Sequence, residues 1–116
     1  MNILAGRGRG TGDLGGVVDV GAWSVAAPLE RYEGEIYLGV RPEQVSLVAP
    51  DQGVGTADVR SVEPLGADTL VRMDAGGQPL VARVSGIPDL RPGDRVGVKL
   101  DRRQLHLFDA AGVRLP

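Results

Sequence analysis

The chain has 116 residues and a formal net charge of −2, with 15 acidic and 13 basic residues interleaved along its length. This length supports one core, or two small subdomains that share one, and excludes a large catalytic domain. The mixed charge disfavours a polyanionic partner such as nucleic acid. The absence of cysteine excludes a disulfide framework and thiolate metal sites, and no apolar run approaches the ~18 residues of a membrane span. We therefore expect a cytoplasmic location.

Eighteen glycines and eight prolines, with few periodicities of helical length, predict short strands and turns. The expected fold class is all-β, a barrel of OB type. Residues 1–7 are a strand candidate, and the glycine-rich residues 6–16 are expected to form a flexible loop. The glycine spacing in residues 10–15 could suggest a dinucleotide-binding turn, but the β-branched residues Val17–Val20 that follow are typical of a strand and not of the required helix.

Alternating apolar residues continue after this loop. Val18 and Val20 begin the pattern, and the row Ile36, Leu38 and Val40 repeats it before a turn at residues 41–44. Residues 50–55 form a connection, which divides the chain into an expected N-terminal subdomain, residues 1–54, and a barrel subdomain, residues 55–116.

The second part is organised around a hairpin at residues 59–73. Pro64 suits the second position of a type I turn, and Gly66 lets the chain leave that turn. The apolar spacing skips from Val59 to Val62, which predicts a β-bulge near Arg60 and Ser61. Further alternating segments lie on either side of a turn at residues 91–94. The residues that we expect to be largely buried are Leu38, Val40, Val62, Leu70, Leu80, Val84, Val98 and Leu107.

An internal echo predicts two related halves. A shift of 60 residues places Ile36-x-Leu38-x-Val40 on Val96-x-Val98-x-Leu100, and residues 44–48 on residues 104–108. Any two alternating strands that flank a turn look alike, so chance similarity is the competing explanation. A true repeat would give two barrel-like halves.

Four segments in this order and spacing carry a resemblance to a known family: residues 39–43, 62–70, 90–94 and 105–109. They resemble the C-terminal regulatory region, often called a TOBE domain, in ATP-binding subunits of sugar-type ABC importers, with the maltose and glycerol-3-phosphate importers as the nearest types. The resemblance runs from Met1 to about Arg114. It implies a nucleotide-binding domain upstream, where ATP and Mg²⁺ would bind, and no cofactor in this fragment.

The resemblance also implies partners. They are the chain's own nucleotide-binding domain, a twin copy in a homodimer, membrane permease subunits and a regulatory protein, on the inner face of the plasma membrane. We expect the strand at residues 1–7 and the glycine-rich loop to take part in the homodimer by exchange between chains.

Catalytic motifs are missing from the sequence. There is no G-x-x-x-x-G-K-[ST] phosphate loop, so this fragment is not expected to bind or hydrolyse ATP. The single histidine, His106, has no second histidine or cysteine with which to build a metal site. Paired carboxylates such as Glu63 and Asp68 flank a turn, where solvated carboxylates are common. We expect no catalytic residue and no metal ligand.

The most informative polar cluster is Arg41, Pro42, Glu43 and Gln44. It is either ordinary turn chemistry, with the Arg41 guanidinium bridging to Glu43 or to a neighbouring carbonyl, or, as the resemblance implies, a structural and regulatory corner that fixes how the domain meets its nucleotide-binding domain or its twin. Gln44 stands where the family usually has histidine. The positions that the resemblance places at a turn and interface are Glu63, Gly66, Asp68, Thr69 and His106.

Two functions from different classes remain. The first is a non-catalytic regulatory domain that supports dimerisation of a transport ATPase. The second is a free-standing module that binds a small oxyanion or nucleic acid, with Arg72 and Arg83 as anion contacts. Arginines paired with Asp58 or Asp74 are the simpler reading of those two residues. Nucleic-acid binding is disfavoured because only Trp23, Tyr32, Tyr37 and Phe108 could stack on bases.

Overall fold

The structure, a computed structural model, describes residues 1–10, 15–29 and 31–115. The described chain is all-β, as the sequence predicts, and its only helices are two 3₁₀ turns, neither long nor apolar enough to span a membrane. The elements in chain order are β1 Asn2–Gly10, β2 Gly16–Val20, β3 Trp23–Ala27, β4 Glu33–Val40, η1 Pro42–Gln44, β5 Val45–Val48, β6 Gly55–Pro64, β7 Asp68–Ala75, β8 Gln78–Ser85, β9 Arg95–Leu100, η2 Arg102–Gln104 and β10 His106–Asp109.

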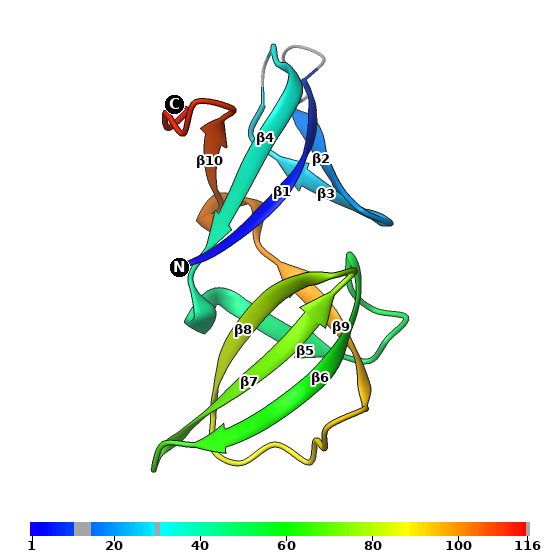
Figure 1. The fold of residues 1–116 in the computed structure, drawn as a ribbon, viewed down its shortest axis with the longest axis vertical. Helices are drawn as coiled ribbons and strands as arrows, with labels where there is room; N and C mark the ends of the chain where they lie inside the picture. Colours follow the sequence, from blue (N-terminus) through cyan, green and yellow to red (C-terminus); the bar gives the residue numbers. More distant parts are fainter. Residues whose placement is uncertain (11–14, 30, 116) are drawn as a thin grey trace.

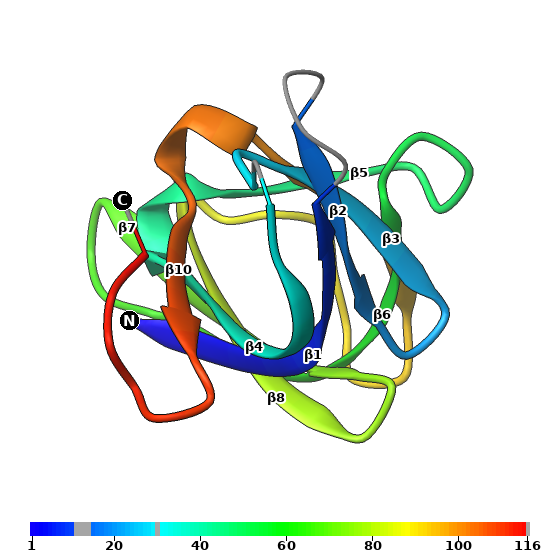
Figure 2. The same cartoon turned by 90° about the horizontal axis from the view of Figure 1, so that it is seen from above.

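The strands form two antiparallel sheets of five. The first, sheet A, has the order β10-β4-β1-β2-β3, and the second, sheet B, has the order β5-β9-β6-β7-β8. They lie one above the other along the 42 Å axis of the molecule (Figure 1), and their strands wrap around a common axis when seen from above (Figure 2). The sheets are not divided at residues 54 and 55, because β5 pairs in sheet B and β10 in sheet A. That residues 1–54 and 55–116 form separate subdomains stays a prediction.

The internal echo is present in the fold. β4, η1 and β5 correspond to β9, η2 and β10. Each sheet receives one edge strand from the other half of the chain: β10 in sheet A and β5 in sheet B. The register agrees as well: Leu47 lies opposite Val98, and Leu107 lies opposite Leu38. A shift of 60 residues therefore relates the two pairs, and the molecule has two related halves that exchange one strand.

The hairpin at the start of sheet B has the predicted bulge, since the pairing of β6 with β7 shifts between Val59 and Ser61. The predicted turn is displaced. Pro64 is the last residue of β6, and the turn is closed by a hydrogen bond from the Leu65 N–H to the Asp68 carbonyl. Gly66 then occupies the first central position with a φ of 103°, which does not fit the predicted type I turn because that turn has negative φ at both central positions.

The N-terminal prediction needs a larger correction. The first strand extends to Gly10, and Gly16 already begins β2, so much of the loop expected over residues 6–16 is strand. Residues 11–14 lie outside the described residues. β1 is a central strand between β4 and β2, so its exchange between chains would dismantle sheet A.

The core lies between and within the two sheets. Five of the eight residues predicted to be buried are so: Leu38, Val40, Leu80, Val98 and Leu107. Val62 and Val84 are half-buried against the same core. The prediction for Leu70 is wrong, because the alternation along β7 places Thr69 inside instead. The Thr69 hydroxyl donates to the Gly86 carbonyl at 2.6 Å, which offsets the cost of burying it.

Candidate functional site

The corner at residues 41–44 is the place where the chain passes from sheet A to sheet B. Pro42 opens η1, where its missing N–H costs nothing, and the Gln44 N–H donates to the Arg41 carbonyl at 2.9 Å. Within the described residues the exposed Arg41 side chain forms no ion pair with Glu43. The corner is thus held by its backbone, and both charged side chains are left at the surface.

Gln44 is the exception in this corner. Its Oε1 atom is buried and has no hydrogen-bond partner within the described chain. An unpaired buried acceptor is costly, and this oxygen is the buried polar side-chain atom of the corner that lacks a partner within the described chain.

The chain returns to sheet A through the related corner at η2. Asp101 begins this turn, and its carboxylate accepts bonds from the backbone N–H of Arg103 at 3.0 Å and from the Arg103 guanidinium at 3.1 and 3.2 Å. These bonds to the Arg103 side chain, and then to its backbone, hold the pKa of Asp101 below its usual value and raise the pKa of Arg103. This corner is therefore closed by an internal ion pair, unlike the corner at residues 41–44.

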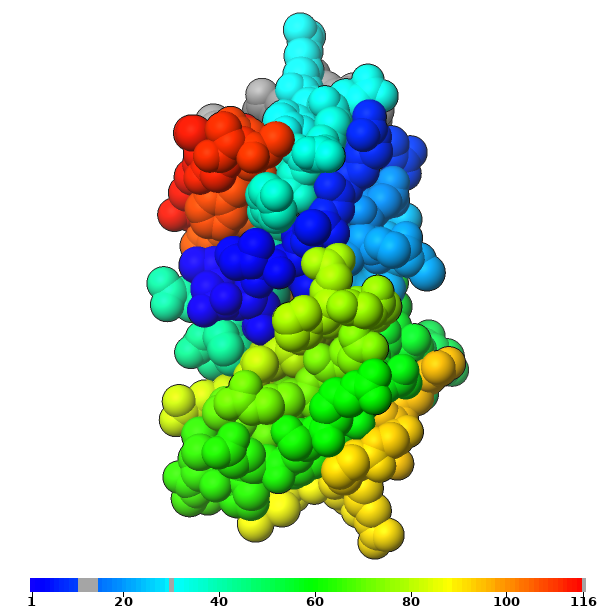
Figure 3. Space-filling view, in the orientation of Figure 1, coloured from blue at the N-terminus to red at the C-terminus, as the bar shows by residue number. Residues whose placement is uncertain are grey.

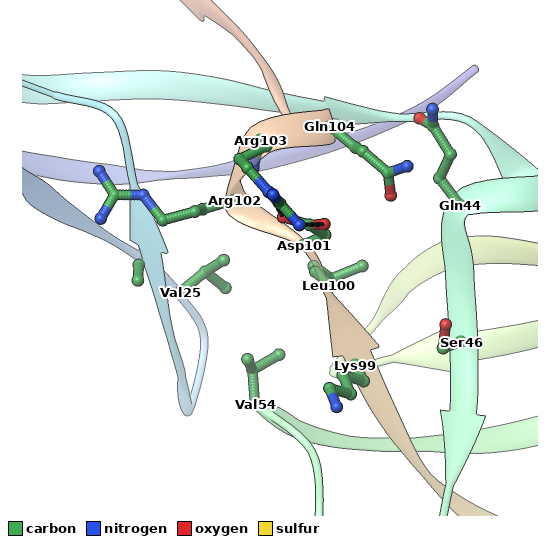
Figure 4. Close-up of a pocket in the computed structure, with 11 residues that line it drawn as sticks. Val25, Gln44, Ser46, Val54, Lys99, Leu100, Asp101, Arg102, Arg103 and Gln104 are labelled. Carbon is green, nitrogen blue, oxygen red and sulfur yellow. Dashed lines mark hydrogen bonds and ion pairs between the residues drawn. The ribbon is translucent and has the colours of Figure 1, made fainter.

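A pocket of about 630 Å³ lies between the two corners, bounded by the ends of β3, β5 and β9 (Figure 4). Figure 4 shows the Arg103–Asp101 pair beside it, while the Arg102 guanidinium points away from that pair. The sequence does not predict this pocket, because its lining combines β3 of sheet A, β5 and β9 of sheet B and both corners, which lie far apart in the sequence. The available signal was the echo that matches residues 101–104 with residues 41–44.

His106 lies at the start of β10, opposite Gly39 of β4, and is half-buried. A side chain at Gly39 would meet Met1, Phe108 and His106 within 3.4 Å, so these three side chains surround the glycine. The Nδ1 atom of His106 is buried and has no partner in the described chain. No cluster of three metal-ligating side chains occurs among the described residues.

The turn residues Glu63 and Asp68 hold the two arginines proposed as anion contacts. Arg72 is 3.7 Å from Glu63, and Arg83 is 2.8 Å from Asp68. The expected partners were different: Asp58 pairs with Arg95 at 3.3 Å and Asp74 with Arg60 at 3.0 Å. Arg72 and Arg83 do share the outer face of sheet B, but each guanidinium already has its own carboxylate, so they do not form a joint anion site.

The fold and these corners define an OB-like β-barrel module. The family model of the TOBE domain matches residues 38–108, and the chain belongs to this family.

The match to three relatives extends over most of the chain. The sn-glycerol-3-phosphate import ATP-binding protein UgpC of Chromohalobacter salexigens is 39% identical over 112 residues, which cover 91% of this chain and 30% of the relative. The UgpC of Cereibacter sphaeroides is 37% identical, with 95% and 30% covered, and UgpC 3 of Agrobacterium fabrum is 34% identical, with 99% and 32% covered. The chain thus spans about a third of the length of these relatives.

Among solved structures, the chain is similar to the cytoplasmic molybdate-binding protein ModG, in a form with molybdate bound. The TM-score is 0.72, and the match covers 97% of this chain and 95% of ModG at 19% sequence identity. At that identity the likeness establishes the shared fold.

Proposed function

We propose that this chain is a non-catalytic regulatory domain of an ABC-type ATP-binding subunit that imports a carbohydrate-type solute. The observation that carries the proposal is the 34–39% identity to UgpC proteins over nearly the whole chain. In this proposal the domain works on the inner face of the plasma membrane with the permease subunits. ATP and Mg²⁺ bind to a separate nucleotide-binding domain.

The geometry supports a role as a rigid spacer. Side chains of each half bond to the backbone of the other: Trp23 Nε1 donates to the Thr56 carbonyl at 3.2 Å, and the Gln78 amide bonds to both the N–H and the carbonyl of Ala5 at 2.8 and 3.0 Å. The two sheets are therefore fastened together at both sides. A unit of this kind can hold a nucleotide-binding domain and a twin subunit in a fixed relation, which is how it would support dimerisation of the ATPase.

Regulation would act through the exposed corner. Arg41 and Glu43 carry charges that no other described residue neutralises within 4.0 Å, so a partner protein can pair with both at once. In the longer protein, Arg41→Ala and Glu43→Ala should change the ATPase rate or its response to the permease. Arg91→Ala, on the loop before β9, is the matched control and should leave both unchanged. Equal behaviour of all three variants would refute the role of the corner.

The absence of catalysis in the chain itself has a direct test. Calorimetric titration of the purified 116-residue chain with Mg-ATP should show no binding, because the sequence lacks a phosphate loop. Micromolar binding would contradict the proposal. The coding sequence upstream of Met1 gives an independent test: a phosphate loop and an LSGGQ-like signature in the same reading frame support an ATP-binding subunit, and an unrelated reading frame speaks against it.

A second candidate function is a free-standing binder of small oxyanions. The pocket between the corners favours it, since Lys99 and Arg102 line the pocket and neither has a carboxylate partner within the described chain. Titration with molybdate, with inorganic phosphate and with sn-glycerol 3-phosphate should then show saturable binding that Lys99→Gln weakens. Binding of none of the three anions would exclude this candidate and leave the first untouched.

A further inference from the structure

One face of sheet A carries apolar side chains that the fold does not use. Successive side chains of a strand point to opposite faces, so Leu4 and Leu38 enter the core while Ile3, Ala5 and Tyr37 point outward. Ile3 is 48% exposed and Tyr37 36% exposed, and Met1 beside them is 57% exposed. We call the outward row of β1 and β4, made up of Ile3, Ala5, Arg7, Glu35 and Tyr37, the β1–β4 face. Figure 3 shows the two segments, in blue and cyan, side by side at the surface.

The chemistry of this face is ordered by the strand register. Ala5 lies opposite Tyr37, and Arg7 lies opposite Glu35. One end of the face is therefore apolar on both strands, and the other end is basic on β1 and acidic on β4. Arg7 and Glu35 are both exposed, and neither forms an ion pair of 4.0 Å or less with any described residue. Two unneutralised charges beside an uncovered apolar patch are what an interface leaves when its partner is removed.

The same face of the other half is different. The positions of β6 and β9 that correspond to Ala5, Arg7, Glu35 and Tyr37 carry Thr56, Asp58, Arg95 and Gly97, and Asp58 pairs with Arg95 within the sheet. Tyr37 has a glycine and Ala5 a threonine at its place in the other half, so the fold itself does not depend on a large apolar side chain at either position. The exposed apolar side chains of sheet A are therefore available for a contact outside the chain.

A two-fold axis makes the β1–β4 face complementary to itself. When two copies pack face to face about an axis parallel to the strands and between β1 and β4, each β1 lies over the β4 of the partner copy. Ile3 and Ala5 then meet Tyr37 of the partner copy, and Arg7 meets Glu35 of the partner copy. Because the arrangement is symmetric, each contact occurs twice, and no like charges are brought together.

We propose that the β1–β4 face binds a second copy of the chain in this face-to-face arrangement. This goes beyond the proposed function, because it assigns a surface and an orientation to self-association and does not depend on any ATPase. It also differs from exchange of the N-terminal strand: β1 stays in its own sheet, and only its outward side chains take part.

The test is a charge exchange between two variants. Arg7→Glu has acidic groups at both positions of the face, and Glu35→Arg has basic groups at both, so each variant alone places like charges opposite one another. Sedimentation equilibrium should show a dimer for the unaltered chain and at least about tenfold weaker association for each variant. An equimolar mixture should recover a one-to-one heterodimer, because acidic faces then meet basic ones.

Two controls separate this geometry from other modes of association. Arg91→Glu reverses a charge on the exposed loop before β9 and should leave dimerisation unchanged. Ile3→Gln should weaken association, whereas Ile87→Gln, at a residue that is 75% exposed on that same loop, should not. A mixture that fails to associate, or an unaltered chain that is monomeric at roughly millimolar concentration, overturns the proposal. The face would then serve a different protein or another part of a longer chain.

Discussion

Sheet A and sheet B follow one strand order but fill it with different side chains. β4, β1, β2 and β3 of the first sheet correspond to β9, β6, β7 and β8 of the second. Some contacts are repeated: Arg9 pairs with Asp19 at 3.0 Å in sheet A, and at the corresponding place in sheet B Arg60 pairs with Asp74 at 3.0 Å. Backbone topology and this one surface ion pair are thus shared by both halves.

The clearest difference lies where the sheets meet. Trp23, the first residue of β3, covers Gly55 so closely that a Cβ there would lie 2.0 Å from the indole ring. The corresponding residues in the other half are Gln78, the first residue of β8, and Leu4. Where one half has Trp23 and Gly55, the other half has the smaller polar Gln78 and the larger Leu4. One junction thus combines a large residue with glycine, and the other combines two residues of intermediate size.

Of the changes at the two junctions, removal of the Trp23 indole should destabilise the fold most. Trp23 is 5% exposed, so Trp23→Ala leaves a cavity at the junction and removes the bond to Thr56. We expect the free energy of unfolding to fall by about 3–5 kcal/mol. Denaturant unfolding followed by circular dichroism measures it.

The matched control at the other junction is Gln78→Ala, which loses hydrogen bonds but little packing and should cost about 1 kcal/mol. Gly55→Leu should be strongly destabilising alone, and less so when combined with Trp23→Gln, which copies the other junction. If the two changes simply added, the idea of a compensated pair would be wrong.

The exchanged strands offer the next comparison. Leu107 of β10 and Leu47 of β5 occupy corresponding places, but Leu107 is 3% exposed and Leu47 only half-buried. Leu107→Ala should therefore lower the free energy of unfolding by about 3 kcal/mol, and Leu47→Ala by about 1 kcal/mol. Equal losses in parallel urea titrations would show that the two exchanged strands contribute equally to the core.

A smaller effect is expected at a contact that only one half has. The Asn2 amide bonds to the N–H and the carbonyl of Val81, both at 2.8 Å, and so covers the edge of β8. The residue at the corresponding position is Gly53, which has no side chain to do this. Asn2→Ala should cost about 1–3 kcal/mol, since two backbone groups lose their partner. Amide hydrogen exchange at Val81 should become faster in the variant, while an unchanged rate would mean that water or another group replaces the amide.

Alternation of apolar residues was enough to predict the fold class, most strands and the bulge at Val59–Ser61. It could not show which strands pair, so the exchange of β5 and β10 was not foreseen. The repeat was found only where the offset is a constant 60. Between Leu4 and Gly55 the offset is 51, and between Trp23 and Gln78 it is 55, so a single shift does not align the first three strands with their counterparts.

The candidate site was harder to predict from the sequence, because it too depends on which strands lie side by side. Whether Arg72 and Arg83 are free depends on which carboxylate lies across the strand, and the sequence places several within reach. The pocket between the corners needs segments of both sheets and both corners to meet, which no local pattern encodes.

The smallest expected effect concerns acid. Asp19 accepts bonds from Arg9 and from the Ser24 hydroxyl at 2.8 Å, and these bonds, that to Arg9 first, lower the pKa of Asp19. A lowered pKa in the folded state means that the carboxylate stabilises the fold above its unfolded pKa of about 3.9, and that this contribution is lost as the pH falls through the folded value. Because the pair is exposed, the contribution should be small.

Asp19→Asn should therefore reduce stability slightly at pH 7 and flatten the loss of stability below about pH 4. Asp51→Asn, in an exposed turn without an ion pair among the described residues, is the control. A pH profile of thermal unfolding identical for all three proteins would show that the Arg9–Asp19 pair has no part in acid stability.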